Sequence, residues 1–246
     1  MRKVGIMSMQ RIANYGSFLQ AYALKQLIEE VGCNVEFVDY HVGAPVIAEN
    51  ADSKNKVVRK IEKGLETFRY RAPLAHKLSF IRYKQSFAKK YMPLLGIADE
   101  MNYNPTVDCL VIGSDEVFNC IQKNSNVGYS PELFGKNNHA KKLITYAASF
   151  GNTTLKKLEK YKKANEVGAL LKKFDAISVR DANSGTIVEQ LTGKEPVYNL
   201  DPVLTYDYMN CCDKIPQVQT NEKYLILYAY AGRISNDEAD WIAAYA

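Results

Sequence analysis

The most constraining feature of this chain is a recurring pattern of short apolar runs, each followed by small or charged polar residues and then by helical periodicity. Five such runs are present, over residues 3–9, 107–112, 142–147, 176–179 and 197–200. Residues 35–40 alternate as a further strand. Because consecutive strands joined by helices run parallel, the pattern predicts an α/β fold with an open, mostly parallel, Rossmann-like sheet.

The sheet pattern is interrupted over residues 43–105, where apolar spacing predicts two helices separated near Pro73. We interpret this stretch as a helical insertion in a domain that covers residues 1–205. The insertion is basic, because residues 54–90 hold twelve Lys and Arg against two Glu, in a chain of net charge +5. Such a segment is either a solvated face or a contact surface for a membrane, a polyphosphate-linked acceptor or nucleic acid. Few aromatic residues stand beside the basic ones in a stacking arrangement, which disfavours nucleic acid.

The pattern changes again after the last run of the sheet. Residues 206–222 have no clear period and contain Pro216, and we predict a linker there. Residues 223–230 predict a strand, and a helix with acidic residues in its first turn begins near Ser235. A strand and part of a helix cannot bury their own apolar faces. We therefore expect residues 223–246 to be the start of a truncated second α/β domain.

Composition narrows the class of protein. Hydrophobic residues make up 47% of the chain and charged residues 24%, as in globular proteins. No apolar stretch approaches the roughly 18 residues that cross a bilayer, and the N-terminus lacks signal-peptide features, so we predict a cytoplasmic protein. The five cysteines are irregularly spaced, which favours reduced thiols over disulfides or zinc. No histidine has a metal-type partner at i+3 or i+4, and we expect neither a metal nor a cofactor.

Candidate functional residues lie where the predicted strands end. In an open parallel sheet, ligands bind in the crevice outside the carboxyl ends of the strands. No G-x-G-x-x-G, G-x-x-x-x-G-K-S/T or G-x-S-x-G motif occurs in the sequence, so the common nucleotide and nucleophile fingerprints are absent. We expect a single site formed by Asn14, Gly16, Ser17, Gly113, Ser114, Asp115, Glu116, Ser149, Gly151, Arg180, Asp181 and Asp201.

These residue types have functional and structural interpretations. The helix that starts near Gly16 offers backbone amides and a dipole to an anion, or simply carries an N-cap. Asp115 and Glu116 supply carboxylates for acid–base chemistry or for orienting a sugar hydroxyl, or they cap the next helix. Arg180 grips a carboxylate or phosphate through two parallel hydrogen bonds, or it forms a local ion pair with Asp181.

Five ordered motifs resemble those of the polysaccharide pyruvyl transferase family. They are NYGSFLQAYAL at residues 14–24, GSDEVFN at 113–119, YAASFG at 146–151, SVRD at 178–181 and LDP at 200–202. The resemblance extends from the N-terminus to about residue 230. It implies a two-domain, glycosyltransferase-B-like enzyme that moves the enolpyruvyl unit of phosphoenolpyruvate onto a sugar, usually as a ketal across two hydroxyls.

The sequence departs from the family pattern in two respects. Glu116 stands where the family commonly has glutamine, and Phe118 stands where it commonly has tryptophan. The family's second domain contributes further basic residues to the donor site, and it would lie beyond Ala246. We therefore expect this chain to be inactive alone.

The resemblance assigns chemistry to the predicted site. Phosphoenolpyruvate carries a carboxylate and a phosphate, for which Arg180 and the amides of Gly16 and Ser17 are the candidate ligands. Asp115 is the candidate for stabilising the oxocarbenium-like centre or for taking the proton of the sugar hydroxyl. The acceptor would be a sugar of a cell-surface polysaccharide or exopolysaccharide, or its lipid-linked precursor. The basic stretch 54–90 would then contact the anionic inner face of the membrane.

Two other functions stay open. A nucleotide-sugar-dependent glycosyltransferase would share the architecture and would bind its nucleotide mainly through the second domain. A non-catalytic anion-binding module would use the basic helices as its working surface, and its nucleic-acid affinity would fall steeply with salt.

Overall fold

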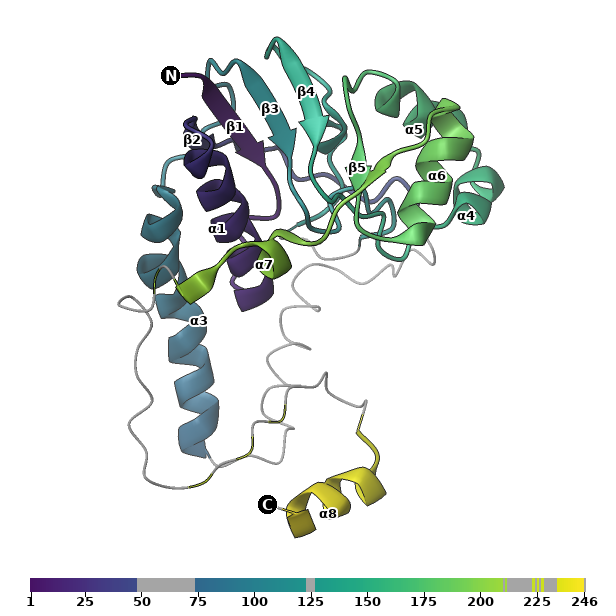
Figure 1. Ribbon diagram of the computed structural model, residues 1–246. Coiled ribbons are helices and arrows are strands. Elements are labelled where there is room, and N and C mark those ends of the chain that lie inside the picture. The colour runs from purple at the N-terminus through teal and green to yellow at the C-terminus, as the bar shows by residue number, and fades with distance from the viewer. Residues whose placement is uncertain are drawn as a thin grey trace. The chain divides into compact units, whose positions relative to one another are not determined.

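The computed structural model describes residues 1–47, 74–122, 127–209, 211, 223, 225, 227 and 234–245. The chain divides into two compact units, Met1–Tyr206 and Asp207–Ala246, and the first holds the sheet (Figure 1). The predicted helix near residues 57–68 and most of the predicted strand over 223–230 lie outside the described residues. The predicted domain and linker boundaries stay predictions.

The central sheet has four parallel strands: β1 (Lys3–Met7), β2 (Asn34–Phe37), β3 (Cys109–Ile112) and β4 (Lys142–Thr145). Their order is β2-β1-β3-β4. β2 lies on one side of β1, and β3 and β4 lie on the other, so the strand order reverses between β1 and β3. This mixed α/β architecture with a parallel sheet confirms the coarse fold prediction.

Two short strands extend the parallel arrangement beyond β4. β5 (Ser178–Val179) pairs in parallel with β6 (Val197–Tyr198). Parallel bridges from Ile144 to Ala176 and from Ala148 to Val179 join β5 to the β4 side. The carboxyl ends of β1, β3, β4 and β5 therefore share one edge, which is the edge where the candidate residues were expected.

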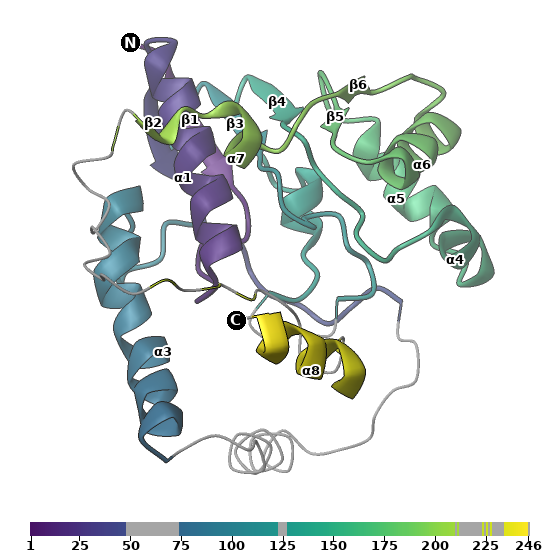
Figure 2. The ribbon, with the colours of Figure 1, turned by 60° about the horizontal axis from the view of Figure 1, so that its bottom comes forward.

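Three helices pack together beside β1. α1 (Tyr15–Glu30) contacts both α3 (Leu74–Leu95) and α7 (Pro202–Thr205), and α7 crosses α1 in both views (Figures 1 and 2). α3 confirms the second predicted helix of the insertion. α1 begins one residue before Gly16, near which its start was predicted, because the Asn14 side chain caps it there.

The second group of helices follows β4 and β5. It comprises α4 (Leu155–Lys160), α5 (Ala164–Leu171) and α6 (Ala182–Thr192), and a 3-10 helix, η1 (Pro131–Phe134), precedes β4. Residues 155–173 do not form one continuous helix. The chain breaks between α4 and α5, where Lys162 adopts a left-handed φ of 56°, which a continuous helix does not allow.

Side chains of the central strands alternate between two cores, one on each face of the sheet. Ile6 and Val111 belong to the core that also contains Phe18 of α1 and Phe87 of α3. The next residues along the strands, Met7 and Ile112, belong to the opposite core. This period of two is the expected result of the pleat, and it buries the strands on both faces as their near-continuous apolar sequence predicts.

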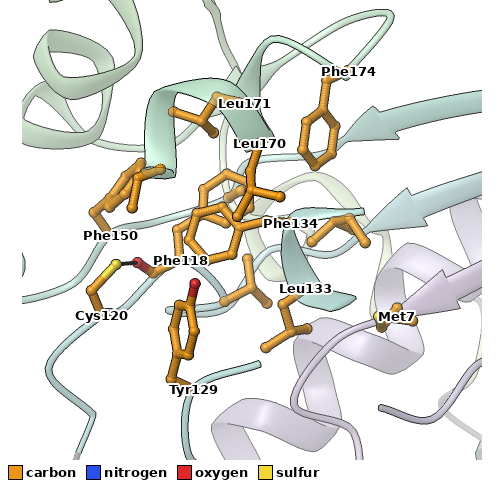
Figure 3. Close-up of a cluster of buried hydrophobic side chains, with 14 of the residues drawn as sticks. Met7, Phe118, Cys120, Tyr129, Leu133, Phe134, Phe150, Leu170, Leu171 and Phe174 are labelled. Atoms are coloured by element: carbon orange, nitrogen blue, oxygen red, sulfur yellow. Dashed lines mark hydrogen bonds between the residues drawn. The ribbon is translucent and has the colours of Figure 1, made fainter. Parts of the chain in front are cut away.

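Phenylalanine rings fill the core on the side away from α1 (Figure 3). Phe118 stacks on Phe134 with ring centroids 4.6 Å apart, and Phe150 lies 5.2 Å from Phe118. All three rings are fully buried. Because Phe118 follows the end of β3 and Phe150 follows the end of β4, this packing fixes the two segments that carry Asp115 and Ser149.

The second unit contains the helix α8 (Asn236–Tyr245), which confirms the helix expected near Ser235. The Ser235 hydroxyl accepts a hydrogen bond from the Glu238 amide, and the Glu238 carboxylate accepts from the Ser235 amide at 2.8 Å, which is a capping box. Within α8 the rings of Trp241 and Tyr245 stack with centroids 6.0 Å apart. Among the described residues, no helix has the length and apolar character needed to cross a bilayer.

Candidate active site

Asp115 joins the carboxyl end of β3 to the first turn of α1. It lies three residues after Ile112, and its Oδ2 accepts a hydrogen bond from the Ser17 hydroxyl at 2.8 Å. Its Oδ1 accepts from the Glu116 backbone amide at 2.8 Å. The side chain is 18% exposed, so it is held in place and still reaches solvent.

Arg180 follows β5 and lies beside Asp115. Its Nη1 donates to the Ser114 carbonyl at 2.9 Å and to the Asp201 carboxylate, while its Nη2 lies 3.9 Å from Asp115 Oδ1. Nε and Nη2 make no hydrogen bond to any residue that the structure describes. The guanidinium is thus anchored by one nitrogen and presents its Nε/Nη2 edge without a hydrogen-bonded partner.

Asp201 is shared between Arg180 and a helix start. Its Oδ1 accepts from the Val203 amide at 3.0 Å and so caps α7, while its other oxygen pairs with Arg180. No ion pair between Arg180 and its neighbour Asp181 occurs within the described part of the chain. The alternative of a self-contained Arg180–Asp181 pair therefore does not describe this arrangement.

The start of α1 is closed by its own cap. Asn14 is extended, and its Oδ1 accepts from the amides of Gly16 at 2.7 Å and Ser17 at 3.4 Å. Of the two interpretations of this helix start, the structure shows the N-cap. An anion that bound these two amides would have to displace the Asn14 side chain, whereas the Ser17 hydroxyl already faces the site through Asp115.

Ser149 and Asp181 are brought together, but they bind each other. The Ser149 hydroxyl donates to Asp181 Oδ2 at 2.7 Å and accepts from the Gly151 amide at 3.0 Å. Asp181 caps α6 by accepting from the Ser184 amide at 2.8 Å and from the Ser184 hydroxyl at 2.8 Å. These groups hold the loops after β4 and β5 in place beside the Asp115–Arg180 pair.

Glu116 faces the loop after β4 and not Arg180. Its carboxylate accepts from the Asn119 side chain at 2.8 Å. It also packs against Gly151, where an added Cβ would lie 2.5 Å from Glu116 Oε2. Gly151 has a left-handed φ of 52°, a conformation that favours glycine, and an added Cβ would also displace the ends of the Glu116 and Asn119 side chains.

A buried tyrosine adds to the electrostatics near Asp115. Tyr40 lies after β2, its hydroxyl donates to the Val127 carbonyl at 3.2 Å, and its side chain is 8% exposed. Burial raises the pKa of this phenol well above its ordinary value, and the charges of Asp115 and Asp39 raise it further. Tyr40 therefore stays a neutral hydrogen-bond donor throughout the physiological range.

The structure also shows a residue that the sequence analysis missed. Gln20 is 3% exposed, and it accepts a hydrogen bond from the Ser114 hydroxyl at 2.8 Å and donates to the Ser8 hydroxyl at 3.0 Å. Gly113 allows the ends of β1 and β3 to meet here, because an added Cβ would lie 2.9 Å from Ser8 Cβ. The available signal was a glutamine at a core-facing position of α1, three residues after Ser17 and four before Leu24, which are both buried.

Residues that could hold a metal are sparse in this region. Within the residues that the structure describes, no group of three or more His, Cys, Asp or Glu side chains is arranged as a metal site. The site is formed instead by one guanidinium between two carboxylates, Asp115 and Asp201, with the Ser17 hydroxyl beside them. Such an arrangement offers hydrogen-bond donors to an anionic group and a carboxylate for proton transfer.

A model of the polysaccharide pyruvyl transferase family matches residues 14–245 of the 246-residue chain. The protein belongs to this family. The match includes every candidate site residue from Asn14 to Asp201, and the resemblance carried by the five sequence motifs is confirmed. Searches of curated proteins and of solved structures gave no match.

Membership of the polysaccharide pyruvyl transferases gives the general activity. These proteins are transferases, so the Asp115–Arg180 pair lies in a chain of that class. The predicted roles of the individual residues stay predictions, as do the donor and acceptor.

Proposed function

We propose that this protein transfers the enolpyruvyl group of phosphoenolpyruvate to a sugar of a cell-surface polysaccharide or of its lipid-linked precursor. The observation that carries the proposal is the geometry of Arg180. Its Nη1 is fixed by Ser114 and Asp201, while its Nε/Nη2 edge lies open beside Asp115. We further propose that the sheet domain is Rossmann-like and forms one half of a glycosyltransferase-B-like enzyme.

The open edge of Arg180 suits a planar carboxylate. Two parallel N–H groups on one side of a guanidinium form paired, charge-assisted hydrogen bonds to the two oxygens of a carboxylate or phosphate. The donor molecule carries both groups. Since Asp115 and Asp201 already carry two negative charges beside one arginine, binding of a multiply charged donor also requires further cationic residues, which the second domain would supply.

Asp115 stands where proton transfer is needed. In the proposed reaction the enol carbon of the donor gains a proton and becomes a methyl group, and a sugar hydroxyl attacks the adjacent carbon. A second hydroxyl of the same sugar then displaces the phosphate, so that one donor and one diol give one ketal and one inorganic phosphate. Asp115 accepts a hydroxyl proton during attack, and the Ser17 hydroxyl and the Glu116 amide keep its two oxygens oriented.

The direct test is to measure the mass of the product that forms from defined substrates. The full-length protein is incubated with phosphoenolpyruvate and candidate saccharides, and we expect a pyruvyl mass gain in the acceptor together with release of one phosphate. Transfer of a sugar from a nucleotide sugar, without use of phosphoenolpyruvate, would instead assign the protein to the glycosyltransferase alternative.

Two aspartates at opposite ends of β3 provide a matched pair of variants. Asp115→Asn removes the proposed base, and we expect kcat/KM to fall roughly a thousandfold, within the range of acid–base catalysis. Asp108→Asn changes the partly exposed residue before β3, which accepts from the Lys3 amide at 3.0 Å, and we expect little effect on activity. Equal activity of Asp115→Asn and Asp108→Asn would remove Asp115 from the mechanism.

The donor-binding role of Arg180 is tested separately by calorimetry. Arg180→Ala should abolish measurable binding of phosphoenolpyruvate, because neither remaining carboxylate attracts an anion. Unchanged affinity in a folded Arg180→Ala variant would show that the donor binds elsewhere.

We also propose that the basic insertion brings the enzyme to the anionic inner face of the membrane, in the cytoplasm. The described helix of the insertion is α3, whose sequence contains no Asp or Glu and includes Arg82, Lys89 and Lys90. Its exposed apolar side chains include Leu74, Leu78 and Leu94. Basic residues near anionic lipid contribute about 1 kcal/mol each, and exposed apolar side chains add to the affinity.

Vesicle sedimentation tests the membrane contact. We expect binding to phosphatidylglycerol vesicles that weakens with salt, and little binding to phosphatidylcholine vesicles. Reversal of charge in Lys89→Glu/Lys90→Glu should reduce the binding. Equal binding of both proteins to anionic vesicles would contradict the contact, and salt-sensitive binding to nucleic acid alone would favour the non-catalytic alternative.

A further inference from the structure

One buried amide side chain lies at the junction of α1, β1 and β3. Gln20 faces the sheet from the second turn of α1. Its Nε2 donates to the Ser8 hydroxyl and to the Ser17 carbonyl, each at 3.0 Å, and its Oε1 accepts from the Ser114 hydroxyl at 2.8 Å. Ser8 and Ser114 are fully buried. The donors and the acceptor of this amide are therefore all satisfied without water.

A buried polar network destabilises the protein unless each of its donors and acceptors has a partner. An apolar side chain of similar size at residue 20 would leave the buried hydroxyls of Ser8 and Ser114 without their partner, and each such loss costs about 1–3 kcal/mol. Packing alone would be served by leucine or methionine. The presence of glutamine therefore indicates that orientation matters at this junction.

The partners of Gln20 are the residues that hold the charged pair. Ser17, whose carbonyl accepts from Gln20, uses its own hydroxyl to hold Asp115 Oδ2 at 2.8 Å. Ser114, whose hydroxyl donates to Gln20, uses its carbonyl to hold Arg180 Nη1 at 2.9 Å. A single amide thus connects the two supports on either side of the 3.9 Å contact between Arg180 and Asp115.

We propose that Gln20 is a positioning residue that holds Asp115 and Arg180 at their working separation, although it touches neither of them. The inference rests on the proposed function, because it assigns Gln20 to the same site. Loss of the amide removes its contacts with the Ser17 carbonyl and the Ser114 hydroxyl, and displacements of about 1 Å at reacting groups lower rates by as much as a hundredfold.

A double-mutant cycle separates positioning from general stability. Gln20→Met in the full-length protein should lower kcat by roughly tenfold to a hundredfold. In an Asp115→Asn background the same change should lower kcat less than about threefold, because the group that Gln20 positions is already lost. The losses in melting temperature should instead add, since a purely structural effect does not depend on Asp115.

The matched control is another glutamine on the same helix. Gln26 is half-buried and donates to Glu29 at 2.9 Å, away from the strand ends, and Gln26→Met should leave kcat unchanged. If Gln20→Met is too unstable to purify, Ser114→Ala takes its place, because it removes the hydroxyl link and keeps the carbonyl that binds Arg180. The same non-additivity with Asp115→Asn is expected, at a smaller size.

The outcomes decide the two proposals separately. An equal loss of kcat from Gln20→Met in both backgrounds, or no loss in a folded variant, overturns the positioning role. Absence of transfer by the wild-type protein overturns the proposed function, and the positioning role is then decided by a crystal structure of Gln20→Met. Displacement of Asp115 from Ser17, or of Arg180 from Ser114, supports that role, and retention of both contacts overturns it.

Discussion

Two arginines at the carboxyl edge of the sheet pair with aspartates in opposite ways. Arg11 follows β1 and binds Asp39 through Nε at 2.6 Å and Nη2 at 2.7 Å. Its remaining donors bind the carbonyls of Ala98 at 2.9 Å and Glu100 at 3.0 Å. Arg180 binds Ser114 and Asp201 through Nη1 alone. The edge that Arg11 uses to close a structural ion pair is the edge that Arg180 leaves open.

The environment of each pair explains this difference. Asp39 is 4% exposed and also accepts from the Asn102 amide at 2.8 Å, so the Arg11 pair fastens the loop after α3 to the ends of β1 and β2. Hydrogen bonding to Asp39 raises the pKa of Arg11 above its ordinary value. Arg180 and its two carboxylates stay partly exposed. The comparison teaches that residue types alone do not mark a site, whereas unsatisfied donors next to a carboxylate do.

The largest expected effect is on the closed pair. Arg11→Met should lower the free energy of unfolding by about 3 kcal/mol, because it leaves the buried Asp39 carboxylate without its cation. Denaturant unfolding measures the loss. The distinction between a structural and a functional arginine is wrong if Arg11→Met is as stable as the wild-type protein while its kcat/KM falls, since Arg11 would then belong to the site.

The open pair should show the reverse behaviour. Arg180→Lys should lower kcat/KM about a hundredfold, equivalent to about 2.7 kcal/mol, because lysine is a point charge that lacks the Nε/Nη2 edge. Its melting temperature should change little. Arg11→Lys is the matched control, and it should lose stability while kcat/KM stays constant. Similar kinetics in both lysine variants would contradict the distinction.

Alanine substitutions at two glycines test how tightly the loop after β4 packs beside the open pair. Gly151→Ala should destabilise the protein by about 2 kcal/mol, because alanine is strained at its positive φ and because its Cβ would meet Glu116. Gly32→Ala has a similar positive φ of 82° and no neighbour within 4 Å. Unfolding midpoints of the two variants isolate the contact with Glu116, and equal losses would show that this close approach is unimportant.

The smallest effect concerns Tyr40, which is influenced by one carboxylate from each pair. Burial raises its native-state pKa, so the unfolded chain, with an ordinary tyrosine pKa near ~10, releases the proton first. The contribution of Tyr40 to the free energy of unfolding is fully present below about pH 10. It decreases as the pH rises, by about 1.4 kcal/mol at pH 11. Tyr40→Phe has no such proton, and its unfolding free energy should fall less between pH 8 and pH 11. An equal fall in both proteins would rule out this contribution.

Much of the fold could be predicted from apolar runs, because strands buried on both faces and their polar ends are local features of the sequence. The ends of β3 and β5 placed Asp115 and Arg180 at one edge of the sheet as expected. Helix boundaries were less accurate, because Asn14 starts α1 through a side-chain cap and Lys162 interrupts a helical pattern through its backbone. Neither effect changes the apolar periodicity.

The partners within the site could not be predicted in the same way. The sequence neighbours Arg180 and Asp181 suggested an ion pair. Asp181 instead caps α6 and accepts from Ser149, while Arg180 meets Asp201. Gln20 was missed because its place on the buried face of α1 does not reveal which groups its side chain meets. Its importance follows from contacts with residues 12 and 94 positions away in sequence.

The single tryptophan of the chain gives each compact unit its own spectroscopic signal. Trp241 lies in α8, within Asp207–Ala246, while the tyrosine cluster of Tyr15, Tyr83 and Tyr91 lies in Met1–Tyr206. Fluorescence excited at the red edge of indole absorption therefore follows the second unit alone, and far-ultraviolet dichroism, dominated by the helices and strands of Met1–Tyr206, follows mainly the first. Melting curves recorded with the two signals distinguish concerted unfolding of the units from independent unfolding.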